Sequence, residues 1–158
     1  MIANATAPGR HYQNAYVTRD LDAAVSRFET AVDLRRQFTT RAKLDVSTPD
    51  GPRDLEAKVA FLWVEDLNIE LIEPIGGTLD LYSEAMPAGD GLGFHHVCHR
   101  VEDWAAARKA VDGSPFPLVL EGGHEALKFL FVDTREWLGH YLELCWMAPE
   151  AWKGMGGR

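Results

Sequence analysis

Apolar and polar residues at the start of the chain follow the order strand, helix, strand. QNAYVT, residues 13–18, has the composition of a strand, and Asp20 then occupies the place of a helix N-cap. Beyond Asp20, apolar residues recur at helical spacing until a predicted helix end near Asp33: Leu21, Ala24, Val25, Phe28, Ala31 and Val32. A further strand is expected at residues 35–41.

The next segment combines a predicted loop with a predicted hairpin. Residues 42–56 contain Pro-Asp-Gly-Pro in their middle, and this density of turn-forming residues favours a loop. The runs KVAFLWV, residues 58–64, and NIELIEP, residues 68–74, then predict two strands joined by a short turn.

The second part of the chain shows the same order of elements. FHHVCHRV, residues 94–101, predicts a strand, Asp103 is the next candidate cap, and residues 104–111 are rich in helix formers. Three strands are expected afterwards, at 117–121, 126–133 and 140–147. The tail from Pro149 contains three glycines and is expected to be loose.

An internal repeat connects the two parts. Gln13 precedes the cap Asp20 by seven residues, and His96 precedes the cap Asp103 by the same distance. An offset of 83 residues therefore relates the two openings. Self-similarity at a fixed offset indicates a duplicated supersecondary unit.

The closing strands of the two parts also correspond. Glu70 lies within Ile-Glu-Leu, and Glu143 lies within Leu-Glu-Leu. Because neighbouring side chains of a strand point to opposite faces, each glutamate faces away from its apolar neighbours. Each part thus presents a glutamate from its last strand and a nitrogen- or amide-bearing side chain from its first.

Charge and composition narrow the classes of partner. The net charge is −8, so the protein would repel the phosphates of nucleic acids and of anionic membranes. No stretch approaches the roughly 20 apolar residues of a membrane span, and residues 1–13 lack the apolar core of a signal peptide.

Cys98 and Cys145 do not form a Cys-x-x-Cys motif. We expect them to be buried thiols in a reducing cytoplasm, and a disulfide between them stays open as an alternative.

Taken together, the motifs resemble those of the vicinal oxygen chelate superfamily, which includes glyoxalase I, methylmalonyl-CoA epimerase, extradiol dioxygenases and bleomycin-resistance proteins. Four segments carry the resemblance in the family's order: QNAYVTRDLDAA, NIELIEP, GFHHVCHRVED and DTREWLGHYLEL. It implies an α+β fold of two tandem βαβββ modules, residues 11–74 and 94–147, joined by a linker at 75–93. A mixed sheet would curve into a cleft with the helices on its convex side, and a homodimer is expected.

The resemblance also implies a site for one divalent metal ion. Carried over residue by residue, the ligands are Gln13, Glu70, His96 and Glu143, a set that suits zinc, nickel, cobalt, manganese or iron(II). His96 is chosen over His95 because the family's ligand directly precedes an apolar residue. The plain alternative is a hydrogen-bonded core histidine and two solvated strand glutamates.

The implied activity is that of an isomerase, epimerase or lyase that forms a metal-stabilised enolate from a small carbonyl compound or acyl thioester. Glu143 is the expected base, with Glu70 on the opposite side of the ion. A non-catalytic binding protein is the main alternative. An extradiol dioxygenase is disfavoured, because Gln13 stands in place of that group's first histidine. Arg100 lies on the His96 face, where it would bind an anionic substrate group or form a surface salt bridge.

Overall fold

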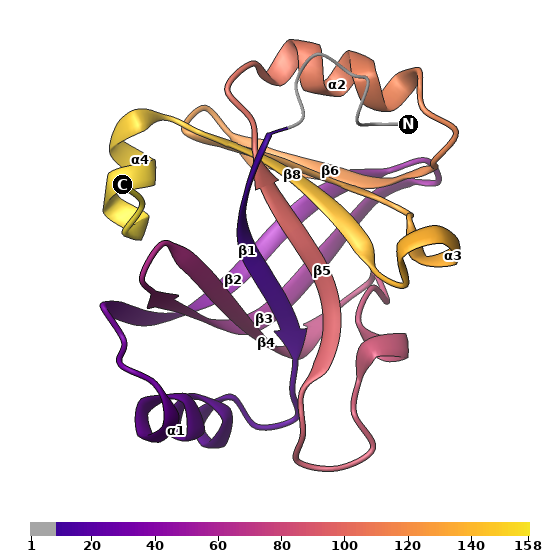
Figure 1. Cartoon of the computed structure of the whole chain (residues 1–158). Coiled ribbons are helices and arrows are strands. Elements are labelled where there is room, and N and C mark those ends of the chain that lie inside the picture. The colour runs from indigo at the N-terminus through magenta and orange to yellow at the C-terminus, as the bar shows by residue number, and fades with distance from the viewer. Residues whose placement is uncertain (1–8) are drawn as a thin grey trace.

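Each half of the chain folds into a strand, a helix and three strands (Figure 1). The computed structural model describes residues 9–158. The first half contains β1 Arg10–Val17, α1 Leu21–Ala31, β2 Arg36–Thr48, β3 Gly51–Val64 and β4 Leu67–Gly77. A 3-10 helix, η2 Ser83–Ala85, lies in the connection. The second half contains β5 Gly93–Arg100, α2 Trp104–Asp112, β6 Leu118–His124, β7 Leu127–Val132, α3 Arg135–Leu138 and β8 Tyr141–Met147, and α4 Pro149–Met155 follows it.

The eight strands form one mixed sheet that closes into a barrel in the order β1-β4-β3-β2-β6-β7-β8-β5. Within each half the first and last strands are parallel neighbours, β1 with β4 and β5 with β8. The halves join through the antiparallel pair of β1 and β5, and they meet again where Val46 and Ser47 pair with Gly122 and Glu121. The predicted α+β class is confirmed, and the expected cleft is enclosed further by this second contact. The module boundaries themselves stay a prediction.

Helices α1 and α2 cover the outer face of the barrel (Figure 1). Leu21 and Ala24 of α1 pack on Leu62 and Leu71, while Ala107 and Val111 of α2 pack on the corresponding strands of the second half. Both predicted caps are present, because the carboxylates of Asp20 and Asp103 accept hydrogen bonds from backbone amides three residues later. With the helices outside, the opposite face of every strand lines the interior.

The loop predicted at 42–56 is wrong. These residues belong to the long hairpin of β2 and β3, whose only turn is at Pro49 and Asp50. The turn residues are confined to that point, where Gly51 adopts a φ of 108°. On both sides of the turn, apolar and polar residues alternate, as in Leu44-Asp45-Val46. This period of two, rather than the density of turn residues, reflects the structure.

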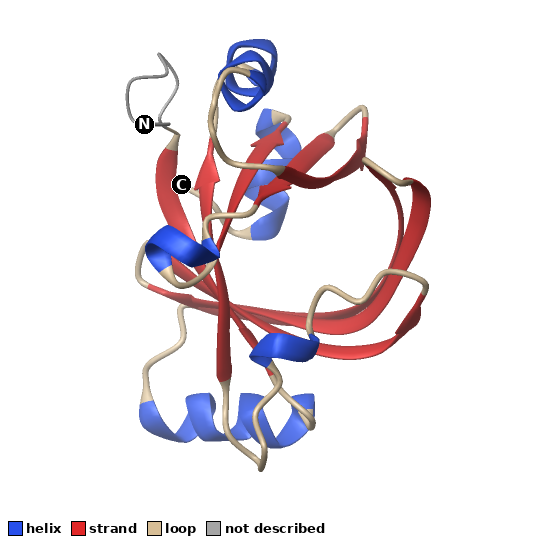
Figure 2. Cartoon of the chain, turned by 90° about the vertical axis from the view of Figure 1, so that its right-hand side faces the viewer, coloured by secondary structure: helices blue, strands red, loops and turns tan. Residues whose placement is uncertain are grey.

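The loose tail predicted from Pro149 is also wrong. Pro149 occupies the first turn of α4, where its missing N–H costs no hydrogen bond. Trp152 of α4 packs edge-on against Tyr12 and Trp63, and the Trp63 indole donates to the Met155 carbonyl at 2.8 Å. These contacts fix the helix on the side of the barrel opposite α3 and η2 (Figures 1 and 2).

The structure also bears on the predictions about membrane spans, a signal peptide and the two cysteines. In residues 9–158, no helix has the length and apolar character needed to cross a membrane. Most of the N-terminal stretch examined for a signal peptide, residues 1–8, lies outside the described residues. Cys98 and Cys145 are buried free thiols.

Candidate metal centre

Two β-bulges determine which side chains of β1 and β5 face the barrel interior. In the pairing of β1 with β5, Tyr12 is an extra residue in β1 and His95 is an extra residue in β5. A bulge lets two consecutive side chains face the same side of a sheet. Tyr12 and Gln13 are therefore both buried, as are His95 and His96. The offset of 83 residues that relates the sequence repeat also relates the two bulges.

Glu70, His96 and Glu143 converge in the interior, one from each of β4, β5 and β8. Their ligating atoms all lie within 4.8 Å of one another. His96 Nε2 is 3.0 Å from a Glu143 oxygen and 3.3 Å from a Glu70 oxygen. The imidazole is 2% exposed, whereas the two carboxylates are 15% and 13% exposed and remain reachable from solvent.

Burial and mutual attraction set the charge of this group. Burial alone would lower the pKa of His96, but Glu143 and Glu70 beside Nε2 raise it to about 9. The pKa of Glu70 is raised by burial and by the nearby Glu143 charge, against the opposing effect of His96. Attraction by the two carboxylates therefore outweighs burial and favours the charged form of His96.

The three residues fit a divalent cation. His96 Nε2 is a fully buried nitrogen whose contacts with the carboxylates do not have hydrogen-bond geometry. One imidazole nitrogen and two carboxylates are ligands that zinc and related divalent ions accept. Replacing the Nε2 proton by such an ion would give this nitrogen a partner and would neutralise the carboxylates.

Gln13, the fourth expected ligand, is 2% exposed and lies beside Asn68 in β4. Its side-chain nitrogen donates to the Asn68 oxygen at 2.9 Å, which leaves the Gln13 oxygen as the free end of the amide. Among residues 9–158, Gln13 makes no hydrogen bond to Glu70, His96 or Glu143. The structure brings three of the four expected residues together and places Gln13 at the position of β1 that corresponds to His96 in β5.

Two tyrosines lie near the group and were not predicted from the sequence. The pKa of Tyr82, in the connection between the halves, is raised by burial and by the charges of Glu70 and Glu143. Tyr12 is buried beside Cys98, and its pKa is raised by burial and, more weakly, by Glu143. The repeat offers a signal only for Tyr12, which directly precedes Gln13 as His95 precedes His96.

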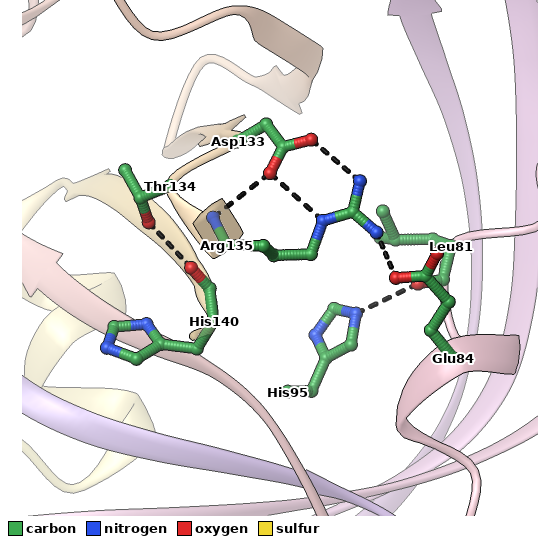
Figure 3. Close-up of polar contacts among 7 residues, drawn as sticks. All are labelled: Leu81, Glu84, His95, Asp133, Thr134, Arg135 and His140. Atoms are coloured by element: carbon green, nitrogen blue, oxygen red, sulfur yellow. Dashed lines mark hydrogen bonds and ion pairs between the residues drawn. The ribbon is translucent and has the colours of Figure 1, made fainter. Parts of the chain in front are cut away.

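The connection between the halves is fastened beside this group by a polar network (Figure 3). His95 Nε2 lies 3.0 Å from the Leu81 carbonyl, and Arg135 forms an ion pair with Glu84. Arg135 also pairs with Asp133 at 2.7 Å, at the end of β7. Residues of the connection are thereby held against the second half of the barrel.

A surface cavity of about 830 Å³ lies near α4, away from the three converging residues. Arg100 lines it, with its guanidinium 4.3 Å from the centre of the Trp152 ring. Among residues 9–158, no carboxylate forms a salt bridge with Arg100, so the surface ion pair considered for this residue is absent. A second cavity, of about 960 Å³, is lined by Arg135 and Trp137 of α3 and by none of the three converging residues.

Comparison with known proteins identifies the family. The model of the glyoxalase/bleomycin resistance protein/dioxygenase superfamily matches residues 12–131, which is most of the chain. The chain belongs to this superfamily. The predicted resemblance is confirmed, because this is the family whose motifs were found in the sequence.

Individual members of the superfamily give a finer comparison. The chain is 27% identical over 142 residues to the ethylmalonyl-CoA/methylmalonyl-CoA epimerase of Cereibacter sphaeroides, covering 86% of this chain and 96% of the relative. The methylmalonyl-CoA epimerase structure from Mycobacterium tuberculosis aligns with a TM-score of 0.62 at 19% identity, over 96% of this chain and 95% of the other.

A Streptomyces coelicolor methylmalonyl-CoA epimerase, solved in complex with 2-nitronate-propionyl-CoA, aligns with a TM-score of 0.61 at 15% identity, over 89% of this chain and 96% of the other. Identities this low show a shared fold. The prediction of an enzyme of the glyoxalase and epimerase kind is confirmed for the family, while the reaction stays a proposal.

Proposed function

We propose that this superfamily member is a metal-dependent epimerase of acyl-CoA thioesters that carry an acidic hydrogen on the carbon next to the thioester carbonyl. The observation that carries the proposal is the convergence of Glu70 and Glu143, one from each half, on the buried Nε2 of His96. The epimerase relative supports the substrate class, since the alignment covers 96% of its length.

Glu70, His96 and Glu143 would hold a divalent ion, with Gln13 as the fourth ligand. Such an ion would stabilise the negative charge that develops on the substrate's carbonyl oxygen when the neighbouring carbon loses a proton. The donor set does not favour one metal among zinc, nickel, cobalt, manganese and iron(II).

Epimerisation needs one group to remove a proton and another to return one to the opposite face of the same carbon. Glu143 is the base that accepts the substrate proton. Glu70 converges on His96 from the other half of the chain, and it is the group that would return a proton to the opposite face. The reverse reaction exchanges these roles. Both carboxylates are largely buried, which limits competition from water.

Two further proposals concern the compartment in which the enzyme acts and its oligomeric state. We propose that the enzyme acts in the cytoplasm, where Cys98 and Cys145 stay reduced. We also propose that it is a homodimer, as the family resemblance implies. Light scattering of the purified protein tests the second statement.

The test uses one enantiomer of methylmalonyl-CoA or ethylmalonyl-CoA in deuterated water, with zinc, cobalt or manganese supplied. NMR follows loss of the α-hydrogen, and chiral analysis follows inversion. In Glu143→Gln, exchange of the enantiomer deprotonated by Glu143 should fall by about 10²–10⁴, the usual contribution of a general base. In Glu70→Gln, exchange should persist while inversion is lost, because the first proton transfer remains and the return step does not.

Glu56→Gln is the matched control, because Glu56 is also a strand glutamate but pairs with Arg41 on the exterior. It should behave as wild type. Wild-type exchange in both Glu143→Gln and Glu70→Gln would remove the enolate mechanism. If metal-loaded wild type exchanges no hydrogen of any CoA thioester tested, the substrate class is wrong.

A further inference from the structure

A chain of hydrogen bonds leads from the connection between the halves to the candidate metal centre. His96 Nδ1 lies 2.8 Å from His95 Nδ1, and His95 Nε2 lies 3.0 Å from the carbonyl oxygen of Leu81. Both histidines face inward because His95 is the bulged residue of β5. Leu81, His95 and His96 are all buried, so water does not replace these partners.

The chemistry of the three groups assigns every proton in the chain. The Leu81 carbonyl can only accept, so His95 Nε2 carries a hydrogen. His95 is 2% exposed, and a neutral ring that carries its hydrogen on Nε2 has a lone pair on Nδ1, which lies 2.8 Å from His96 Nδ1. This lone pair accepts from His96, whose Nδ1 therefore carries the hydrogen.

We propose that His95 is a positioning residue that keeps a hydrogen of His96 on Nδ1, so that Nε2 is the nitrogen that can bind a metal ion, and that the Leu81 carbonyl fixes His95 in turn. This inference rests on the proposed metal centre. It gives the centre an outer hydrogen bond of the kind that orients metal-binding histidines, with an imidazole in place of the more usual carboxylate or carbonyl.

The hydrogen bond from His96 Nδ1 to His95 does not depend on what His96 Nε2 binds. Whether Nε2 holds a proton or an ion, Nδ1 still donates to His95. His96 Nε2 would therefore bind a metal ion beside Glu70 and Glu143 without rotation of the ring. Leu81 belongs to the connection between the halves, and the Arg135–Glu84 ion pair holds that connection against the second half (Figure 3).

The proton assignment can be measured in the unmodified protein. Long-range ¹H–¹⁵N NMR of the imidazoles, recorded on the metal-free and zinc-loaded protein, distinguishes the two tautomers. We expect His95 to be the Nε2–H tautomer in both samples and His96 to keep its Nδ1 hydrogen. A hydrogen on His95 Nδ1 in either sample would overturn the inference. The metal-free sample gives this result even if the protein binds no zinc.

Zinc affinity in three proteins tests the role. His95→Phe keeps an aromatic ring beside Tyr82 and Tyr141 but removes the acceptor, while His95→Asn keeps an oxygen near the place of Nδ1. Chelator competition should show affinity about 10–100-fold weaker in His95→Phe and within about threefold of wild type in His95→Asn. Circular dichroism establishes that each variant is folded.

The outcomes separate this inference from the proposed function. Equal affinity in all three proteins, or an equal loss in both variants, would show that His95 has a packing role only. Absence of zinc, cobalt and manganese binding by wild type would instead remove the metal centre itself. If His95→Phe does not fold, the NMR measurement still decides the proton assignment.

Discussion

Stability of the metal-free protein should fall as pH rises through the pKa of His96. That pKa is 6.5 in an unfolded chain and about 9 in the folded protein, where Glu143 and Glu70 favour the imidazolium. A pKa raised by folding contributes stability that is fully present below pH 6.5 and is lost as pH rises through about 9. Glu70, whose pKa is also raised, loses its contribution in a range that begins lower, at 4.5.

The expected size follows from the two pKa values of His96. The difference between 6.5 and about 9 corresponds to about 3 kcal/mol, lost at about 1.4 kcal/mol for each pH unit of that range. With a urea dependence of about 1.5 kcal/mol per molar, the unfolding midpoint should fall by about 2 M between pH 6.0 and pH 9.5.

Urea unfolding of protein freed of metal by a chelator measures this, with His96→Gln beside wild type. The variant lacks the titrating group, so the other ionisations can be subtracted. His124→Gln removes an exposed histidine and should keep the wild-type difference. An equal fall in the midpoints of wild type and His96→Gln would refute the assignment of the proton to a site between the two carboxylates.

Two further predictions concern packing outside the metal centre. Gly93→Ala should destabilise the protein by about 2 kcal/mol, because a Cβ there would lie 1.5 Å from the Ala85 carbonyl oxygen; Gly89→Ala, with no atom within 4 Å, should not, and thermal unfolding compares the two. Trp152→Ala should cost about 2–3 kcal/mol in urea, because Trp152 packs on Tyr12, Trp63 and Arg100. Trp137→Ala should cost less than about 1 kcal/mol, because that ring is 60% exposed; equal losses in the two tryptophan variants would mean that α4 does not stabilise the barrel.

Short-range patterns predict the order of elements, while the resemblance to the superfamily assigns the three residues of the centre. Glu70 and Glu143 are visible as polar residues inside apolar strands, and the repeat identifies their equivalence. The error at 42–56 arose from weighting turn residues over an alternation that continues on both sides of them. The error at the tail has a different cause, since α4 is stabilised by Tyr12 and Trp63, which lie far away in sequence.

The surroundings of the centre depend on contacts that a single sequence does not reveal. Tyr82 lies in a connection rich in glycine and proline and has no repeat partner. His95 can be assigned to the interior only once the bulge is known, because strict alternation would place it on the face opposite His96. His96 could therefore be predicted as a ligand from the sequence, whereas the positioning role proposed for His95 depends on a one-residue shift in strand pairing.

The paired bulges at Tyr12 and His95 show how the two halves differ in their use of the same backbone feature. A duplicated strand with a bulge offers two adjacent inward positions in each copy. In the second copy the extra position holds His95, next to the candidate ligand His96. In the first copy it holds Tyr12, which packs on Trp152 of α4. The same irregularity of the backbone therefore places a side chain beside the candidate metal centre in one half of the molecule and against α4 in the other.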